Sequence, residues 1–402
     1  MRVWMLSWEY PPHVVGGLGK HVMELAPALA AAGIEVHVLS PRLYGGSFEE
    51  GWRGLFVHRV DVPRMHEYDY LSFVSESNAV LQERADWLMK EAGRPDLVHA
   101  HDWLVARAAV QCKHHHRLPL IATIHATERG RGRGQLGGPQ SQAIHGTEWW
   151  LTYEAWRVIC ASRYMAGQVQ DYFASPADKV DVIPNGVGPS RFQALEGVDL
   201  SDFRSNYAVP DEKIVFNVGR IVEEKGVHIL VESVPQVLAQ YEKAKFVVAG
   251  TGVLLDALRH RAWQLGVYER IYFCGYIPDE TRDRLYKVAD VAVFPSLYEP
   301  FGIVALEAMA ARTPVVVAET GGLAEVVRHA ETGITVYPGK PDSLAWGILH
   351  TLQNPEWTHQ RVENAYREVL EHYNWSTIAQ QTVAVYERVL AEYERSAWGR
   401  DG

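Results

Sequence analysis

The sequence is poor in cysteine and has no long uninterrupted apolar run. Its 402 residues include three cysteines, Cys112, Cys160 and Cys274, an odd number at distant positions. This argues against a disulfide scaffold and indicates a reducing compartment. No segment reaches the ~18 consecutive apolar residues of a membrane span, so we expect no stable membrane insertion. The apolar stretch 1–7 is cut short by Glu9, too brief for a signal-peptide core. We expect a buried strand there and a cytoplasmic protein.

Basic residues are in the minority. The chain has 39 Lys and Arg against 49 Asp and Glu, a formal net charge of −10. This balance gives no broad basic surface for nucleic acid or for an acidic membrane, and we expect neither as a partner. The remaining composition, with 47% hydrophobic residues, is that of a soluble globular protein. Because a typical domain has roughly 150 residues, two domains are expected.

Short apolar runs alternate with helical patterns along the chain, and the series starts twice. This alternation predicts parallel strands joined by crossover helices. The fold class is therefore α/β, with two doubly wound parallel sheets in domains 1–186 and 187–373, followed by an amphipathic helix within 374–402. The apolar runs are 3–6, 35–39, 96–99, 120–124, 158–161 and 180–183 in the first series, and 214–218, 245–249, 270–274, 291–294 and 315–318 in the second.

Loops that follow strands are where chemistry is expected, because open parallel sheets bind ligands at the carboxyl ends of their strands. Glu299 follows the run 291–294, and a helix starting just after it leaves free N–H groups in its first turn. Glu299 can accept from sugar hydroxyls and Glu307 can reach a second polyol; two ordinary helix glutamates are the alternative. The N–H groups concerned belong to Phe301, Gly302, Ile303 and Val304.

Two cations follow the first strand of the second series. Arg220 and Lys225 leave the carboxyl end of the run 214–218, where they can neutralise a diphosphate leaving group. A solvated charged turn with Glu223 and Glu224 is the alternative. The chain contains no Asp-x-Asp pair, so a magnesium-bridged diphosphate has no visible ligands. We therefore expect no metal, and two side-chain cations in its place.

Glycines follow the first strand of the first half. Gly16 and Gly17 open a helix whose N-terminus favours a phosphate, although a tight connection explains them equally well. The segment 132–137 matches the dinucleotide fingerprint G-x-G-x-x-G, the only support for a nicotinamide-dependent dehydrogenase. Pro139 stands where the helix of that motif should run, and the expected acidic residue is missing. A mobile lid over 129–138 is the favoured interpretation.

Histidines also follow strands in this half. His125 ends the run 120–124 and is expected to face a cleft. His99 and His101 share a strand face, which permits a metal site, as does the run 114–116. Because neither set has the mixed Cys/His spacing of a zinc site, core or loop histidines are the favoured interpretation.

Taken jointly, these segments make the chain resemble glycosyltransferase family four, and within it the short prokaryotic glycogen and starch synthase-like members. The resemblance covers nearly the whole chain. The segments that carry it are 7–12 with 16–18, 99–103, 184–187, 219–226, Glu299 with Glu307, and 320–323. Residues 125–130 and 148–150 further resemble the prokaryotic glycogen synthase-like branch.

The resemblance implies a GT-B fold, with two Rossmann-like domains facing a cleft and the last helix crossing back onto the N-terminal, acceptor-side domain. It implies a hexosyltransferase that uses a nucleotide-sugar donor, retains the anomeric configuration, and needs no metal and no cofactor. Arg220 and Lys225 would hold the diphosphate, Glu299 and the amides of 301–304 the donor sugar, and Glu307 the ribose.

In the N-terminal domain the resemblance implies that Gly16 and Gly17 close on the phosphates. His125 would sit beside the anomeric carbon and the donor's primary hydroxyl. The remaining acceptor-side candidates are Glu9, His101 and Asp102.

The expected reaction moves glucose from ADP-glucose or UDP-glucose to an α-1,4-glucan or maltooligosaccharide. Eight of the 13 tryptophans precede residue 157, which suits an acceptor groove there, although core packing explains them as well. The alternatives are transfer to a small acceptor such as glucose-1-phosphate, or to a lipid. Val14 and Lys20 stand where the bacterial glycogen synthases carry a lysine and an acidic residue. These departures leave the nucleotide base and polymer synthesis open.

Overall fold

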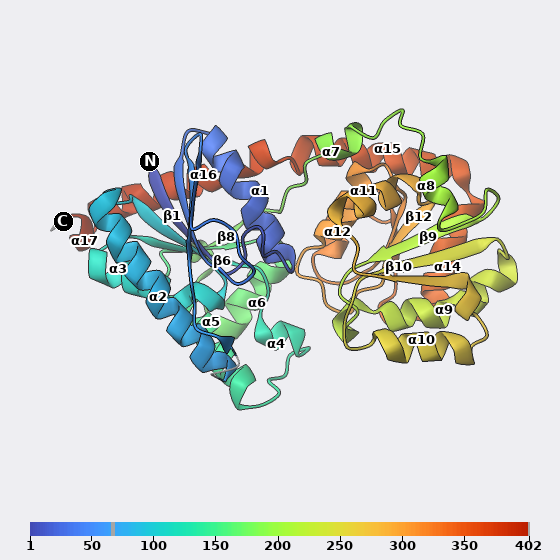
Figure 1. The fold of residues 1–402 in the computed structure, drawn as a ribbon, viewed down its shortest axis with the longest axis horizontal. Coiled ribbons are helices and arrows are strands. Elements are labelled where there is room, and N and C mark those ends of the chain that lie inside the picture. Colours follow the sequence, from blue (N-terminus) through green and yellow to red (C-terminus); the bar gives the residue numbers. More distant parts are fainter. Residues whose placement is uncertain (66–68, 401–402) are drawn as a thin grey trace. The chain divides into compact units, whose positions relative to one another are not determined.

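The computed structural model describes residues 1–65 and 69–400. The chain divides into two compact units, one built from Met1–Asn185 together with the segment from Trp375 onward, the other from Gly186–Asn374. Figure 1 shows the elements of both units. Among the described residues, no helix is both long and apolar enough to cross a membrane.

The first unit contains an eight-stranded sheet in the order β3-β4-β2-β1-β5-β6-β7-β8. Every neighbouring pair is parallel except β3 with β4, which form an antiparallel ribbon at one edge. The strands are β1 (Arg2–Ser7), β2 (Glu35–Pro41), β3 (Glu49–Trp52), β4 (Leu55–Val60), β5 (Leu97–His101), β6 (Leu120–Ile124), β7 (Arg157–Cys160) and β8 (Val180–Val182).

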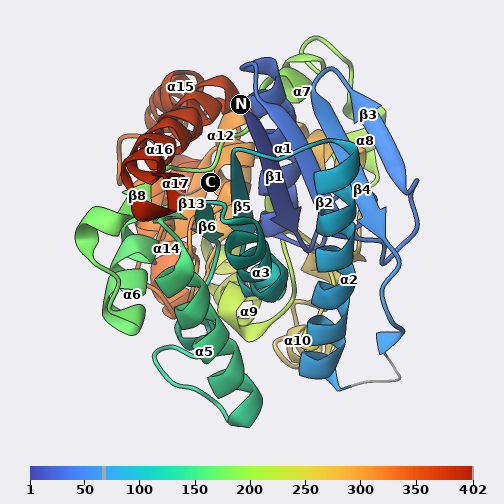
Figure 2. The ribbon, with the colours of Figure 1, turned by 90° about the vertical axis from the view of Figure 1, so that its left-hand side faces the viewer.

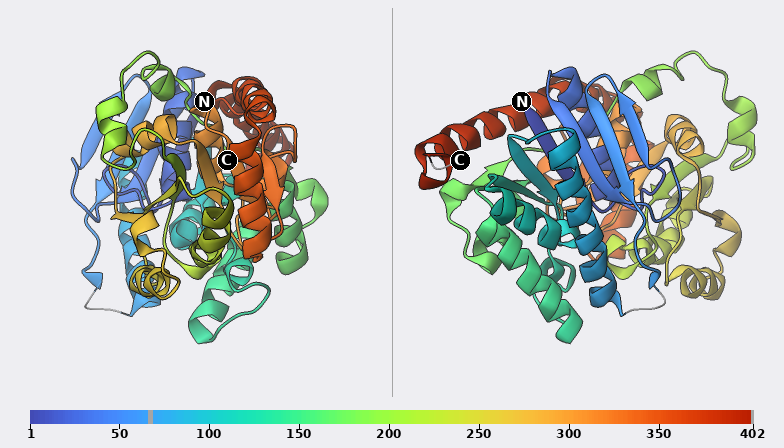
Figure 3. Two further views of the ribbon diagram at one scale, coloured as in Figure 1. Left: turned by 90° about the vertical axis from the view of Figure 1, so that its right-hand side faces the viewer. Right: turned by 60° about the vertical axis from the view of Figure 1, so that its left-hand side comes forward.

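Helices cover both faces of this sheet (Figures 2 and 3). Along β1, Trp4 and Leu6 pack into the core shared with α2 and α3, while Val3 and Met5 pack into the core shared with α1 and α16. Successive side chains of a strand point to opposite faces of the sheet. Because helices cover both faces, consecutive residues of the strand must all be apolar. The helices are α1 (Gly17–Ala31), α2 (Tyr70–Glu91), α3 (Ala106–His116), α4 (Glu128–Arg131), α5 (Pro139–Glu154) and α6 (Arg163–Phe173).

The C-terminal helix belongs to the first unit. Helix α16 (Trp375–Arg395) packs against α1 and buries Ile378, Val385 and Val389 in the core on that face. The hydroxyl of Tyr386, also on α16, lies 2.7 Å from Nδ1 of His99 on β5. A short helix α17 (Ala397–Arg400) follows.

The second unit contains a six-stranded, wholly parallel sheet in the order β11-β10-β9-β12-β13-β14. Its strands are β9 (Lys213–Val218), β10 (Ala244–Ala249), β11 (Ile271–Gly275), β12 (Val291–Phe294), β13 (Val315–Ala318) and β14 (Ile334–Val336). The prediction of two doubly wound parallel sheets is therefore confirmed, with the β3–β4 ribbon as an unpredicted addition.

Helices also cover both faces of the second sheet. Val215 of β9 packs with α9 and α14, while its neighbour Phe216 lies 5.2 Å, centroid to centroid, from Tyr286 of α11. The helices are α7 (Ser190–Gln193), α8 (Ser201–Ser205), α9 (Val227–Gln240), α10 (Leu255–Gln264), α11 (Asp279–Val288), α12 (Ile303–Ala310), α13 (Leu323–Val326), α14 (Pro341–Gln353) and α15 (Pro355–His372). Helices α7 and α8 lie between the two series of apolar runs, where no element was predicted.

Candidate functional site

The second unit brings Lys225 and Glu299 together. The ammonium of Lys225 lies 2.7 Å from Oε2 of Glu299, and the hydroxyl of Ser296 donates to the same oxygen at 3.2 Å. Strands β9 and β12 are hydrogen-bonded neighbours, so the loops that follow them emerge side by side. Glu299 is buried, with 7% of its surface exposed. The two strand-end residues singled out from the sequence therefore form one ion pair.

Arg220 is placed differently from Lys225. Its guanidinium pairs with the carboxylate of Glu224 and its side chain is 51% exposed. The backbone carbonyl of Glu224 in turn accepts from the N–H groups of Leu297 at 2.8 Å and Tyr298 at 3.2 Å. Thus the loop that carries both predicted cations is tied to the loop that carries Glu299.

Gly226 makes this close approach of two loops possible. Its φ of +67° lies in the left-handed region, and an added Cβ would lie 1.9 Å from the carbonyl oxygen of Pro295. A residue with a side chain would strain the backbone and clash with the neighbouring loop. Lys225 therefore owes its position to the glycine that follows it.

Helix α12 begins at Ile303, with Gly302 as its N-terminal cap at φ +104°. The first N–H groups of a helix have no acceptor within the helix, which makes this turn suitable for polar ligand oxygens. Gly322 packs against the backbone of this turn, because a Cβ there would lie 2.4 Å from Cα of Phe301. The predicted helix start just beyond Glu299 is thereby confirmed, with Phe301 buried and Val304 in the first turn.

Glu307 is almost fully buried and already bound by protein groups. Its carboxylate lies 3.0 Å from Nη2 of Arg191 and 3.2 Å from the hydroxyl of Tyr286. Nε of Arg282 lies 3.6 Å from Oε2, the oxygen that also accepts from Tyr286. The sequence indicated Glu307 as a ligand for a polyol, but gave no signal for the three residues that hold it. They come from α7 and α11, so only the folded chain shows them.

The first unit gathers four histidines around the carboxyl ends of β5 and β6. Nδ1 of His101 lies 3.1 Å from Nε2 of His125, because β5 and β6 are neighbouring strands. The ring of His21 on α1 lies 4.8 Å from the ring of His125, centroid to centroid, and Nδ1 of His21 donates to Oδ1 of Asn185 at 2.6 Å. The ring of His99 lies 4.3 Å from that of His101.

Burial keeps these imidazoles neutral. It lowers the pKa of His21 to about 4 and that of His99 to about 3. Burial and the neighbouring imidazoles hold the pKa of His101 and of His125 well below the ordinary value. At neutral pH the cluster therefore offers uncharged donors and lone pairs, and it supplies no positive charge.

Two carboxyl groups beside the histidines are also buried. Asp102 accepts from the backbone N–H of His125 at 2.7 Å, and burial raises the pKa of Asp102 to about 7. Glu148 on α5 accepts from the N–H of Glu128 at 2.8 Å, and burial raises the pKa of Glu148 to about 8. Asp102 is thus a fixed support of the His125 backbone, and Glu148, which the sequence did not single out for chemistry, supports the next turn.

Glu9 supports the glycine turn at the start of α1. Its Oε2 accepts from the N–H groups of Val15 at 2.8 Å and Gly16 at 3.0 Å. Gly16 caps α1 and Gly17 is its first residue. The structure therefore places Glu9 beside the predicted phosphate-binding glycines.

The segment that matched the dinucleotide fingerprint has the wrong context. Residues 132–137 lie between α4 and α5, where Arg129 donates to the carbonyl of Gly134 at 2.9 Å. A dinucleotide site needs this motif between a strand and a helix. The dehydrogenase interpretation is wrong on this point.

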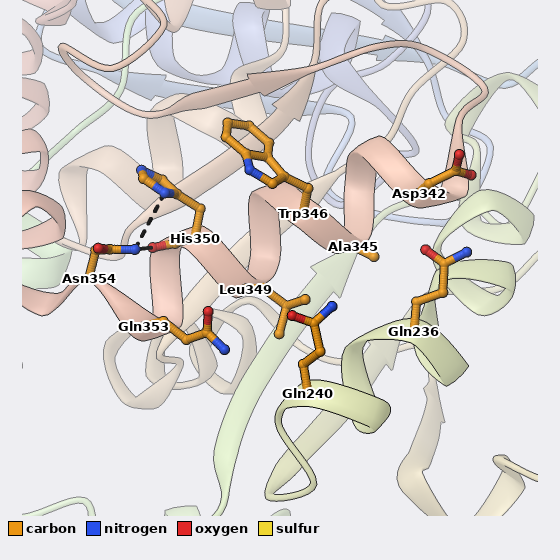
Figure 4. Close-up of a pocket in the computed structure, with 9 residues that line it drawn as sticks. All are labelled: Gln236, Gln240, Asp342, Ala345, Trp346, Leu349, His350, Gln353 and Asn354. Atoms are coloured by element: carbon orange, nitrogen blue, oxygen red, sulfur yellow. Dashed lines mark hydrogen bonds between the residues drawn. The ribbon is translucent and has the colours of Figure 1, made fainter.

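A pocket with a volume of about 210 Å³ lies between α9 and α14, apart from the residues described above (Figure 4). It is lined by polar side chains such as Gln236 and Gln240 around the exposed ring of Trp346. None of the residues singled out for chemistry lines it.

Known glycosyltransferases are similar to this protein over nearly the whole chain. Residues 15–191 match the family model Glycosyltransferase Family 4, and residues 200–368 match Glycosyl transferases group 1. An uncharacterized glycosyltransferase of Methanocaldococcus jannaschii is 40% identical, over 96% of this chain and 98% of its own. The glycogen synthase of Mycobacterium tuberculosis is 35% identical, over 96% and 94%. The alpha-maltose-1-phosphate synthase of the same species is 31% identical, over 97% and 100%.

Solved structures show the same fold. Sucrose-phosphate synthase from Thermosynechococcus elongatus has a TM-score of 0.83 at 24% identity, covering 97% of this chain and 99% of its own. The Anabaena protein Alr3699/HepE in complex with UDP-glucose has a TM-score of 0.77 at 21% identity, covering 96% and 100%. The two parallel-sheet, Rossmann-like units are those of a GT-B fold, as predicted.

Proposed function

This chain belongs to glycosyltransferase family 4, and from that premise we propose that it transfers glucose from ADP-glucose or UDP-glucose to an α-1,4-glucan or maltooligosaccharide. The transfer is proposed to proceed with retention of the anomeric configuration and without a metal. The protein is a glycosyltransferase. Its donor, its acceptor and the stereochemical course of its reaction are what we propose.

The contact between Lys225 and Glu299 carries the proposal. A nucleotide sugar joins an anionic diphosphate directly to a ring of hydroxyl groups, so its binding site needs a cation beside a hydrogen-bond acceptor. Lys225 and Glu299 supply this pair 2.7 Å apart at the ends of two adjacent strands. Lys225 would stabilise the charge that develops on the leaving diphosphate, and Glu299 would accept from the sugar hydroxyls.

Arg220 would add a second cation to the diphosphate. Its exposed side chain can leave Glu224, because an exposed ion pair contributes little free energy. The first N–H groups of α12 would bind further donor oxygens. Glu307 would accept from the ribose through a carboxylate that Arg191 and Tyr286 hold in place.

His125 would contribute as a neutral group. Its backbone carbonyl and ring would lie beside the anomeric carbon and the donor's primary hydroxyl. With its pKa held far below neutrality by burial and neighbouring imidazoles, the ring can only exchange hydrogen bonds there. The acceptor hydroxyl would attack from the face that the phosphate leaves and give its proton to that phosphate, so no enzymic nucleophile is needed.

Similarity to a glycogen synthase at 35% identity supports a glucan acceptor. Similarity to an alpha-maltose-1-phosphate synthase at 31% supports the second candidate, in which the same chemistry acts on glucose-1-phosphate.

A screen of donors against acceptors tests both candidates. The protein is incubated with labelled ADP-glucose or UDP-glucose and with maltooligosaccharides, glycogen, glucose-1-phosphate or a lipid extract. We expect label in the glucans. Label in a phosphorylated disaccharide alone would replace the first candidate by the second, and label in lipid alone would exclude both.

A further inference from the structure

The cluster of His21, His101 and His125 is built from three separate elements of the first unit. His21 lies on α1, His101 ends β5 and His125 follows β6. One nitrogen atom from each ring lies within 4.8 Å of the others. Three imidazoles whose nitrogens converge in this way can hold a metal ion, since a bound ion needs its ligands close together and fixed.

Two ring nitrogens of the cluster lack a partner. Nε2 of His21 and Nε2 of His101 are buried and have no hydrogen bond to any of the residues that the structure describes. His21 is 4% exposed and His101 is fully buried. A buried polar atom left without a partner is unfavourable, and it calls for a water molecule or an ion that completes it. A metal ion is a partner of this kind.

The surroundings fix His21 in the form that binds a metal. Its Nδ1 donates to the amide oxygen of Asn185, which can only accept. The proton therefore lies on Nδ1, and Nε2 keeps its lone pair for a ligand bond. Metal-binding histidines are usually oriented by a second hydrogen bond of this kind.

The fourth histidine of the cluster provides an internal contrast. His99 is equally buried, but Thr123 and Tyr386 each lie 2.7 Å from one of its two ring nitrogens. Both ring nitrogens of His99 therefore have a partner, whereas the unpartnered nitrogens belong to His21 and His101.

We propose that His21, His101 and His125 form a binding site for a divalent transition metal, and that metal bound there inhibits the enzyme. Three imidazoles select Zn²⁺, Cu²⁺, Ni²⁺ or Co²⁺, whereas Mg²⁺ and Ca²⁺ prefer oxygen ligands. Three protein ligands leave a further position for water or a substrate oxygen.

Inhibition follows because the metal takes His125 away from other partners, and this second step rests on the proposed function. Nε2 of His125 now lies 3.1 Å from Nδ1 of His101. Once a ring nitrogen of His125 is coordinated, it can no longer exchange hydrogen bonds with a donor sugar.

The binding step is tested by titrating the metal-stripped full-length protein with Zn²⁺ against a chelating dye. A second group, Asp86, His115 and His116, can also hold a metal, so the titration uses the His115→Ala, His116→Ala variant as its background. We expect one Zn²⁺ per chain. His21→Gln and His101→Gln should each weaken binding at least about 100-fold, and Asn185→Ala about 10- to 100-fold, because Asn185 orients the ring of His21.

His99→Gln is the matched control, because it removes an equally buried imidazole that is not a ligand. It should leave the affinity for Zn²⁺ within about threefold, and circular dichroism verifies that each variant is folded. Equal affinities in the His21, His101 and His99 variants would overturn the site. So would the absence of any binding tighter than about 100 µM in the background protein.

Transfer assays at increasing Zn²⁺ separate the two steps. Loss of activity in step with occupancy of the site supports inhibition. Full activity at saturating Zn²⁺ overturns the inhibition and leaves the site intact. If no donor and acceptor pair reacts at all, the proposed function fails, while the dye titration still decides whether the metal binds.

Discussion

Nζ of Lys225 and Oε2 of Glu299 lie 2.7 Å apart although the two residues are 74 positions apart in the chain. Each stands beyond the carboxyl end of a buried strand, and the two strands are neighbours in the sheet. The cation is therefore neutralised by the same carboxylate that would bind the donor sugar. Under the proposed function, a diphosphate and Glu299 would compete for Lys225.

Glu299→Gln should separate binding from catalysis. The amide leaves Lys225 free for a diphosphate, so we expect the affinity for ADP or UDP to rise about three- to tenfold. The turnover number should fall at least about 100-fold, because a carboxylate that orients the sugar in the transition state is lost. Calorimetry with the nucleotide alone and initial rates with the full donor measure the two effects.

Glu224→Gln is the control for this variant. It frees Arg220, but the Arg220 side chain is half exposed and its ion pair contributes little free energy, so nucleotide affinity should change less than about threefold. Weaker nucleotide binding in Glu299→Gln would contradict the competition between the diphosphate and Glu299.

Gly226→Ala should disturb both stability and the position of Lys225. A side chain at φ +67° is strained, and its Cβ would lie 1.9 Å from the carbonyl oxygen of Pro295. We expect the free energy of unfolding to fall by about 2–4 kcal/mol, with a loss of turnover, as the two loops move apart.

Gly197→Ala is matched to it. Gly197 has φ +77°, but an added Cβ there meets nothing within 4 Å. The cost should be the strain alone, about 1–2 kcal/mol, without loss of turnover. Urea denaturation measures both variants, and equal destabilisation would show that the contact with Pro295 does not matter.

The sequence predicted those parts of the site that depend on local patterns. Lys225 and Glu299 each follow a short apolar run, and parallel sheets align the ends of such runs, so their approach could be anticipated. Strand β3 could not be predicted from the sequence, because all four of its residues are exposed and show no apolar pattern.

Contacts between segments far apart in the chain could not be predicted from the sequence either. The bond between His21 and Asn185 joins residues 164 positions apart, and nothing in either local sequence indicates it. The burial of Glu307 likewise depends on how α7 and α11 pack, since Arg191 and Arg282 come from those helices. Helix periodicity shows which face of a helix is apolar, but it does not show which charged side chains of different helices form ion pairs in the folded chain.

Glu307→Gln should destabilise the second unit strongly. It removes the negative charge between Arg191 and Arg282, and Arg282 is buried. The two guanidiniums lose one carboxylate, although Asp279 and Asp283 still pair with Arg282 and Asp283 still pairs with Arg191. The free energy of unfolding should therefore fall by about 1–3 kcal/mol. Glu363→Gln removes the partner of Arg312 at the surface and should cost less than about 1 kcal/mol. Similar urea midpoints for the two variants would argue that the Glu307 network contributes no stability.

Glu148 should make the protein less stable as the pH rises above neutrality. Burial raises its pKa to about 8 in the folded protein, whereas in the unfolded chain it titrates near 4.5. Between about pH 4.5 and 8 the folded protein therefore holds a proton that the unfolded chain has released. The contribution of Glu148 to stability is full below this window and is lost as the pH rises toward 8, with a slope of up to about 1.4 kcal/mol per pH unit.

Glu148→Gln should flatten this part of the stability profile. Glutamine keeps an oxygen that can accept from the N–H of Glu128 and has no proton to lose. The buried histidines act in the opposite direction, because their rings are neutral in the folded protein but titrate near 6.5 in the unfolded chain. Their contribution to stability therefore rises with pH through this region, and it is the same in both proteins. Asp102 contributes only up to its pKa of about 7, and equally in both proteins. Urea midpoints for the two proteins at pH 7, 7.5 and 8 give the comparison; parallel profiles would mean that Glu148 is already ionised at pH 7 in the folded protein.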